Sequence, residues 1–316
     1  MASDQCQMTR SSPLPVAMRN GIGVITAGIN GAPVQLIVNT ASSFSILSMA
    51  AAKRLHLPLV GPYSMGSRGG QMSAYITTVE TLSIFGYQAH NVKLGVSGNA
   101  PAGIDGTLGE DELRLADVEY DFANRVMRLV VPKYCGNEPL AYWAAGKRVT
   151  MIKLEPDAES GQVGRIAGSV RVNGIRLSAV FVTGRYGSVL SRAAAQRLGV
   201  APGGHGVEPI PNQGGAGSPV LWAAPIATFQ IGGETIEHTH LLVADGPTSL
   251  GVDLEIGTDF FESHHVYVAN SQHRMYMTYN GGPVFALDAA QQKELHTGGR
   301  LRSGPSGMPG ARSGSP

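Results

Sequence analysis

An internal repeat constrains the fold of this chain more than any other feature. When the sequence is shifted by 143 positions, two stretches align without a gap, and eleven of the aligned positions are identical. Asn30-Gly31 falls on Asn173-Gly174, and residues 45–48 fall on residues 188–191. A fixed offset over this length indicates a duplicated structural unit.

The repeat predicts where the domains begin and end. We expect an N-terminal segment at 1–13, a first lobe at 14–136, a linker at 137–147, a second lobe at 148–290, and a disordered tail at 291–316. The tail is assigned as disordered because it is rich in Gly, Ser and Pro and has little to bury.

Each half contains many short strand patterns. An apolar strand, an Asn-Gly pair and a return strand form a hairpin signal in both halves. Ser48 and Ser191 each precede an Ala-rich stretch, which predicts a brief helix with a serine N-cap. Turns are frequent, because the chain holds 42 Gly and 19 Pro. The sequence therefore predicts an all-β fold with two similar lobes, each of mostly antiparallel strands and a short helix.

Charge and hydropathy exclude two classes of partner. The formal net charge is +1, with acidic and basic residues interspersed, so we expect no nucleic-acid partner. No apolar run reaches the roughly 18–20 residues of a membrane span. Residues 1–20 are polar and lack the apolar core of a signal peptide.

The order of the motifs resembles the retropepsin/pepsin-like aspartic proteases. In that family an apolar pair precedes Asp-Thr-Gly, a serine and a short helix follow, and an apolar-Gly-x-Asp segment and a strand come later. The corresponding segments here are Val38-Asn39-Thr40-Ala41, Phe181-Val182-Thr183-Gly184, 106–111, 254–259, 120–125 and 267–272. The resemblance covers about residues 14–286 and is strongest to the exported bacterial tandem type, which implies the two-lobed retropepsin-like fold.

The resemblance places the catalytic dyad at Asn39 and Val182, and neither residue is an aspartate. The family's two aspartates share one proton, so that one activates a water and the other protonates the scissile carbonyl. Asn39 cannot act as a base, and Val182 can neither take nor give a proton. Thr40, Thr183 and Gly184 are kept, and the resemblance implies that the two threonines cross-link the loops.

Two further residues depart from the family's loop pattern. Ala41 replaces the first turn glycine, which is expected to reshape that turn. Arg185 stands where the family has a small residue. A long cation there is expected to fill space and to depress the pKa of a neighbouring carboxylate.

Four other aspartates and four histidines are candidate substitutes for the missing acids. Asp105 and Asp253 are interpreted as turn residues, and Asp111 and Asp259 as capping or solvated residues. The histidines interpreted as exposed strand residues are His238, His240, His264 and His265. No HExxH or CxxC motif is present, so no metal and no cofactor are expected.

The chain has two cysteines, Cys6 and Cys135. Their spacing alone fits two unrelated thiols as well as a disulfide. The exported tandem type has a cysteine near the mature N-terminus and another after the first lobe, so the resemblance implies a Cys6–Cys135 disulfide. That bond would indicate a periplasmic or secreted protein.

Three functions fit these observations. The favoured interpretation is a pseudoprotease that binds an extended peptide between the lobes without cutting it. An active aspartic endopeptidase is the second, and it requires Asn39 to be an engineered substitution and a second acid from elsewhere. A structural or assembly module is the third.

Overall fold

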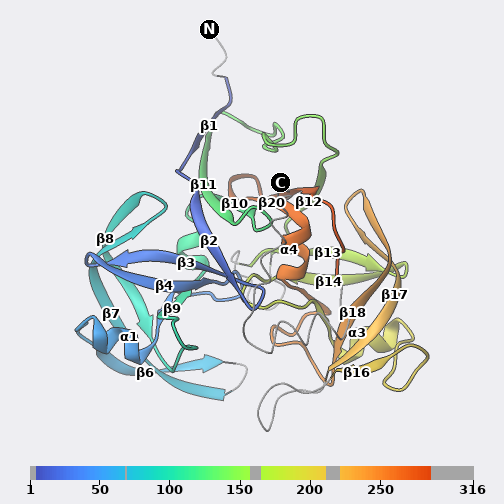
Figure 1. Cartoon of the computed structure of the whole chain (residues 1–316), viewed down its shortest axis with the longest axis horizontal. Coiled ribbons are helices and arrows are strands. Elements are labelled where there is room, and N and C mark those ends of the chain that lie inside the picture. The colour runs from blue at the N-terminus through green and yellow to red at the C-terminus, as the bar shows by residue number, and fades with distance from the viewer. Residues whose placement is uncertain (1–4, 68–69, 157–164, 211–220, 286–316) are drawn as a thin grey trace, which may run out of the picture.

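The computed structural model describes residues 5–67, 70–156, 165–210 and 221–285. Two β lobes lie side by side, the first coloured blue to cyan and the second yellow-green to orange in Figure 1. The elements of the first lobe are β2 (Leu14–Arg19), β3 (Ile22–Ile29), β4 (Ala32–Val38), β5 (Ile46–Leu47), α1 (Met49–Arg54), β6 (Val60–Ser67), β7 (Gly70–Ile84), β8 (Tyr87–Val96), β9 (Gly106–Leu108) and α2 (Glu110–Leu113).

The second lobe repeats this order. Its elements are β13 (Ala167–Val172), β14 (Ile175–Phe181), β15 (Val189–Leu190), α3 (Arg192–Arg197), β16 (Glu208–Ile210), β17 (Leu221–Ile231), β18 (Glu234–Ala244), β19 (Leu254–Ile256) and α4 (Thr258–Ser263). Strand order is also repeated: β4-β9-β5-β8-β7-β6 in the first lobe corresponds to β14-β19-β15-β18-β17-β16 in the second. The expected all-β fold of two similar lobes is confirmed.

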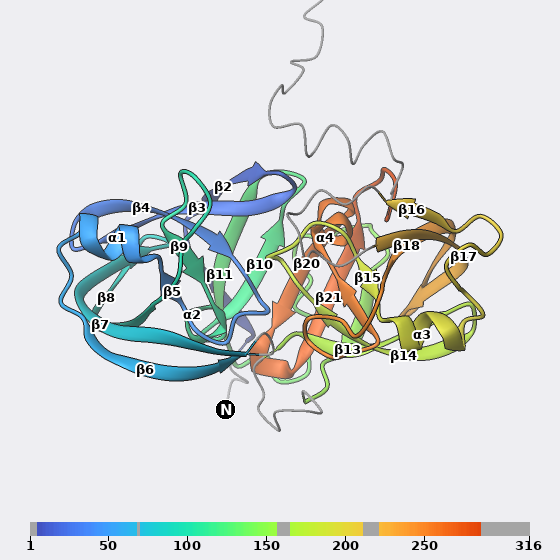
Figure 2. The same ribbon diagram turned by 90° about the horizontal axis from the view of Figure 1, so that it is seen from below.

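A shared antiparallel sheet joins the lobes. Its strands are β1 (Gln7–Arg10), β10 (Asp117–Asp121), β11 (Val126–Lys133), β12 (Thr150–Lys153), β20 (His264–Ala269) and β21 (Arg274–Tyr279), and the short 3-10 turn η1 (Asn270–Gln272) connects the last two. The strand order is β12-β21-β20-β10-β11-β1, and the central β10–β20 pair, with Val118 opposite Val268, crosses between the lobes. Figures 1 and 2 show that this sheet lies between the two lobes. Because β1 and β12 are 143 positions apart, the duplication extends into the shared sheet.

Local chemistry explains the repeated hairpins and helices. Asn30 and Gly31, like Asn173 and Gly174, all have positive φ, as a two-residue hairpin turn requires. The side chains of Ser48 and Ser191 each accept a hydrogen bond of 3.1 Å from the third backbone N–H of the following helix. Both predicted hairpins and both predicted serine caps are thus confirmed.

Aromatic rings fill the core where the two lobes meet. The ring of Phe261 in α4 lies 5.6 Å from Tyr120 and 5.9 Å from Phe122, both of the first lobe, and 6.5 Å from Phe181 at the end of β14. Each of these four side chains is at most 1% exposed. Burial of large rings from both halves indicates one continuous apolar core rather than two independent domains.

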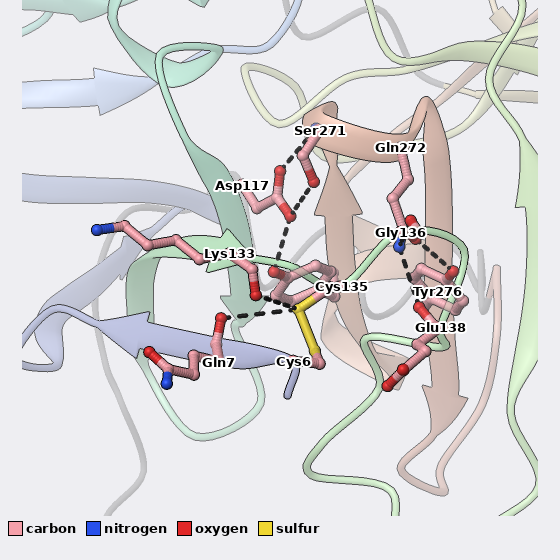
Figure 3. The surroundings of a disulfide bond; sticks show 11 residues. Cys6, Gln7, Asp117, Lys133, Cys135, Gly136, Glu138, Ser271, Gln272 and Tyr276 are labelled. Atoms are coloured by element: carbon pink, nitrogen blue, oxygen red, sulfur yellow. Dashed lines mark hydrogen bonds between the residues drawn. A yellow bond between two sulfur atoms is a disulfide. The ribbon is translucent and has the colours of Figure 1, made fainter. Parts of the chain in front are cut away.

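The structure contains the Cys6–Cys135 disulfide, which fastens β1 to the end of β11 (Figure 3). In the same region Asp117 of β10 accepts hydrogen bonds from the backbone N–H and hydroxyl of Ser271, at 2.8 and 2.9 Å. These contacts attach the end of the first lobe to the second. No helix in the described part of the chain could span a membrane. The predicted disordered tail, 291–316, lies outside the described residues, and the predicted domain limits stay predictions.

Candidate active-site loops

Two equivalent loops approach each other where the lobes meet. The first follows β4 and begins at Asn39, and the second follows β14 and begins at Val182. The backbone N–H of Asn39 donates to Leu108 O at 3.0 Å, and that of Val182 donates to Ile256 O at 2.7 Å. Each loop therefore lies on the parallel strand that pairs with its own β-strand, β9 or β19.

Thr40 and Thr183 lock the loops together. The backbone N–H of each threonine donates to the other's Oγ1 at 3.1 Å. Each hydroxyl in turn donates to a carbonyl of the opposite loop, Thr40 to Phe181 O at 2.7 Å and Thr183 to Val38 O at 2.8 Å. Both side chains are fully buried. The reciprocal pattern makes the loops one rigid unit, because four buried hydrogen bonds cross the lobe boundary.

Asn39 faces the second loop but is held by its own. Its Oδ1 accepts a hydrogen bond of 2.9 Å from the backbone N–H of Ala41. Its side chain lies so close to Gly184 that a Cβ at that position would collide with it. Gly184 is thus required by the close approach of Asn39. The amide lies where a carboxylate would reach the opposite loop. Unlike a carboxylate, it neither gains nor loses a proton near neutral pH.

Val182 lies in an apolar environment. It is 4% exposed and clusters with Ala167 and Val180, and Ala41 of the first loop packs against this cluster. A carboxylate at this position would be desolvated without a partner. The first loop thus presents an amide and the second presents a methyl surface.

A buried ion pair stands beside the second loop. Arg185 donates from Nη1 to Glu255 Oε2 at 2.6 Å, and the side chain of Glu255 is 0% exposed. Glu255 Oε1 accepts from Ser249 Oγ and from the backbone N–H of Leu250, both at 2.7 Å. Arg185 was expected to be a long cation that fills space near the dyad positions. In the structure its charge is paired with Glu255, a carboxylate that was not predicted from the sequence to be its partner.

Asp111 and Asp259 have equivalent structural roles. Each accepts from a serine, Ser45 or Ser188, with 2.9 Å to the backbone N–H and 2.7 Å to the hydroxyl. The interpretation of these aspartates as capping or solvated was therefore wrong about solvation for Asp259, whereas Asp111 is half-buried. Asp259 is 5% exposed, and burial raises its pKa to about 6, although the hydrogen bonds from Ser188 and the charge of Arg185 oppose that rise.

Asp105 and Asp253 also form a matched pair. Asp105 accepts from the backbone N–H of Gln35 and from Arg54, and Asp253 accepts from the backbone N–H of Ser178 and from Arg197. Their carboxylates fasten the helices α1 and α3 to the lobe sheets. This agrees with a structural rather than a catalytic interpretation.

The histidines divide into two groups. His238 and His240 are exposed, as expected, and His238 has a φ of 52° at an irregularity of β18. The expectation was wrong for His264 and His265, which are 0% and 7% exposed. Their ring Nε2 atoms pair with Glu234 at 2.8 Å and Glu119 at 2.9 Å. Adjacent strand residues point to opposite faces of a sheet, so the two histidines contact different carboxylates.

Metal ligands do not gather in the described ranges: no group of three or more His, Cys, Asp or Glu side chains could hold an ion there. The functional candidates that sequence interpretation missed are Glu255 and Glu110. Both are glutamates inside otherwise apolar motifs, in Leu254-Glu255-Ile256 and Leu108-Gly109-Glu110. A charged residue beside apolar residues, in a segment that would otherwise be expected to be buried, was the available signal.

Comparison with known proteins agrees with this architecture. A family model described as aspartyl protease matches residues 25–111 and 168–260, one segment in each lobe and together more than half of the chain. No curated protein matches the chain. The crystal structure of an aspartic proteinase from Irpex lacteus superposes with a TM-score of 0.56 at 13% identity, covering 89% of this chain and 99% of that one. At this identity the superposition shows the fold alone. The chain belongs to the aspartyl protease family.

Proposed function

We propose that this protein is a pseudoprotease that holds an extended peptide between its lobes without hydrolysing it. The observation that carries the proposal is the pair of residues at the starts of the two loops. Asn39 is hydrogen-bonded within its own loop, and Val182 is packed in an apolar cluster. General acid–base catalysis by each positioned group typically contributes about 10²–10⁴-fold. Without a carboxyl on either loop, a water between them is no better a nucleophile than bulk water.

Three other acids near the loops, Glu255, Asp111 and Asp259, are already engaged. Glu255 has one oxygen on Arg185 and the other on Ser249 and Leu250. Asp111 and Asp259 use both oxygens on Ser45 and Ser188. A general base must reach and polarise a substrate water, and a carboxylate that is fully hydrogen-bonded to the scaffold is a poor base. This supports loss of the hydrolytic step rather than its transfer to another residue.

Peptide binding is supported by the sheet edges. In the described part of each lobe, β6 pairs only with β7 and β16 only with β17, so each of the two is the edge strand of its sheet. Both edge strands lie on the lower side of the molecule in Figure 1, one in each lobe. An extended peptide binds such edges through main-chain hydrogen bonds. Phe44, 55% exposed and close to Gly109 behind the first loop, adds an apolar contact.

The proposal is tested by capturing peptides on the immobilised full chain. A random decapeptide library is incubated with the protein, and bound and unbound peptides are analysed by mass spectrometry. We expect a subset of peptides to be retained with intact sequences. Phe44→Lys should reduce retention, whereas Tyr87→Lys, an equally exposed aromatic position at the distal β7–β8 turn, should not. Equal retention by both variants, or no retention by the unmodified protein, would refute peptide binding between the lobes.

A further inference from the structure

We propose that Arg185 is the residue of the second loop that binds the ligand, and that it donates to an uncharged oxygen of an extended peptide, a main-chain carbonyl or a side-chain amide. The inference rests on the proposed function and deepens it, because it names the kind of acceptor that the site selects. Arg185 follows Gly184 directly in the chain, and Gly184 lies against the side chain of Asn39 in the first loop. The arginine therefore starts from the point where the two loops meet.

The partner of Arg185 places its guanidinium group beside both loops. Nη1 donates to Oε2 of Glu255 at 2.6 Å, and Oε1 of the same carboxylate accepts from the backbone N–H of Leu250 at 2.7 Å. Leu250 packs on the apolar cluster that contains Val182, and Ala41 of the first loop packs on the same cluster. The ion pair therefore lies next to the start of the second loop and close to the first loop, where a peptide held between the lobes would pass.

The guanidinium group has donors that the protein itself does not use. Glu255 engages it through one nitrogen, because the other carboxylate oxygen accepts from Ser249 and Leu250. Within the described ranges no other group accepts a hydrogen bond from the side chain of Arg185, and its Nε is buried without any partner. An arginine frequently uses its planar fork for a bidentate pair with a carboxylate. Here the fork is only partly used, and the side chain is 32% exposed, so a ligand can reach N–H groups that remain.

The charges around Arg185 favour an uncharged acceptor over a carboxylate. Arg185 already pairs with Glu255, whose side chain is 0% exposed. Its charge also acts on the buried Asp259, where it opposes the rise in pKa that burial causes. One cation therefore faces two acids, and a ligand carboxylate would add a third negative charge to the same region. A carbonyl or amide oxygen accepts the hydrogen bond without adding charge.

The duplication shows that this donor belongs to one loop only. The repeat places Ser42 at the position of Arg185, and the hydroxyl of Ser42 donates to Phe44 O at 2.7 Å within its own loop. Thr107 stands at the position of Glu255. A peptide between the lobes would therefore meet a hydrogen-bonding cation from the second loop and the 55% exposed ring of Phe44 from the first. The two loops are thus expected to contribute unlike contacts to one ligand.

Capture of a random decapeptide library on the full chain tests the donor and the acceptor together. The chain is immobilised at pH 7, and bound peptides are sequenced by mass spectrometry. We expect peptides with Asp or Glu to be retained at least about threefold less than matched peptides with Asn or Gln. The double variant Arg185→Met/Glu255→Leu lacks the donor and the buried charge, so its total retention should fall about tenfold and its discrimination should weaken.

Removing an exposed ion pair elsewhere in the second lobe is the control. Arg176→Met/Glu155→Leu should leave both retention and discrimination unchanged. If the unmodified chain retains peptides and Arg185→Met/Glu255→Leu retains them within about twofold, the role of Arg185 is overturned and peptide binding stands. Equal retention of acidic and amide peptides by the unmodified chain would overturn the proposed acceptor. No retention by the unmodified chain would refute peptide binding and the Arg185 contact with it.

Arginine Nε–H resonances give a second readout, on the unmodified, isotope-labelled chain. The Arg185 signal is identified by its absence from Arg185→Lys, which keeps a cation beside Glu255. Adding the most strongly retained decapeptide should shift this signal saturably, because a ligand oxygen on the guanidinium group changes the surroundings of Nε. An ion pair with a purely structural role would not respond to the peptide. A decapeptide that shifts the backbone amide signal of Gly184 to saturation without moving the Nε–H signal of Arg185 would overturn the proposal.

Discussion

The two lobes share a framework and differ in the residues that it presents. Ser45 and Ser188 donate to Asp111 and Asp259 with identical distances, and the two threonine contacts across the loops agree within 0.1 Å. At the loop tips the halves diverge. Asn39 corresponds to Val182, and Ala41 to Gly184.

The difference separates the contacts that position the loops from the side chains that the loops present. Contacts that position the backbone are retained twice, since losing any one would leave a buried polar group unsatisfied. The residues that begin the two loops differ between the halves: Asn39 carries an amide and Val182 carries two methyl groups. The second half further acquired the Arg185–Glu255 pair, whose counterparts in the first half are Ser42 and Thr107.

The largest expected effect comes from placing aspartate at the start of the second loop, compared with the same residue at the start of the first. Val182→Asp should lower the free energy of unfolding by about 3–4 kcal/mol, because the carboxyl would be buried among Ala167 and Val180 without a partner. Asn39→Asp should change it by less than about 1 kcal/mol, since the half-buried carboxylate keeps the Ala41 N–H. Urea unfolding at pH 7 measures both values. Equal costs would show that the two loop starts have equivalent environments.

The ion pair found only in the second lobe comes next. Arg185→Met should cost about 2–3 kcal/mol of unfolding free energy, because it leaves Glu255 charged and buried; the 32% exposure of the arginine keeps the loss below that of a fully buried pair.

Removing both partners of this pair is the control. Arg185→Met combined with Glu255→Leu should recover to within about 1 kcal/mol of the original protein. Arg176→Met, from the exposed Arg176–Glu155 pair, should cost less than about 0.5 kcal/mol. If the single and double variants are equally unstable, the loss comes from packing rather than charge.

The threonine contacts should behave symmetrically. Thr40→Val and Thr183→Val should each cost about 2 kcal/mol, since each leaves one carbonyl and one backbone N–H of the other loop unsatisfied. The double variant should cost less than the sum, because both substitutions break the same network. Denaturant unfolding of the three proteins tests this, and strict additivity would argue against a shared network.

The smallest effect concerns a carboxylate of the first lobe and a histidine of the second. Burial would raise the pKa of Glu119, but the hydrogen bonds from His265 and Tyr142 and the charges of His265 and Arg128 outweigh burial and lower the pKa. A lowered acid pKa contributes stability above its unfolded value of about 4.5, and that stability is lost as pH falls through the folded pKa.

Glu119→Gln should therefore flatten the acid side of the stability profile between about pH 5 and pH 3. Trp143, stacked on His265 at 4.5 Å, reports the change by its fluorescence. An unchanged acid slope in the variant would place the pH dependence elsewhere.

Local signals in the sequence predicted the framework well. Asn-Gly turns and serine caps are decided by neighbouring residues, so both hairpins and both helices could be located. The burial and pairing of His264, His265 and Glu255 could not be predicted, because their partners are 30, 146 and 70 positions away in the chain. A histidine that looks polar and exposed in a strand becomes buried when a distant carboxylate pairs with it.

The most direct test of the central claim is a cleavage assay on the unmodified chain. A random peptide library is incubated with the protein at pH 3–7, with and without a pepstatin-type inhibitor, and new termini are counted by mass spectrometry. The double variant Asn39→Asp/Val182→Asp runs in parallel, and we expect it to fall short of full activity because Ala41 and the Arg185–Glu255 pair remain. If the protein is a pseudoprotease, the unmodified chain should produce no inhibitor-sensitive termini at any pH. Cleavage by the unmodified chain that the inhibitor abolishes would contradict it.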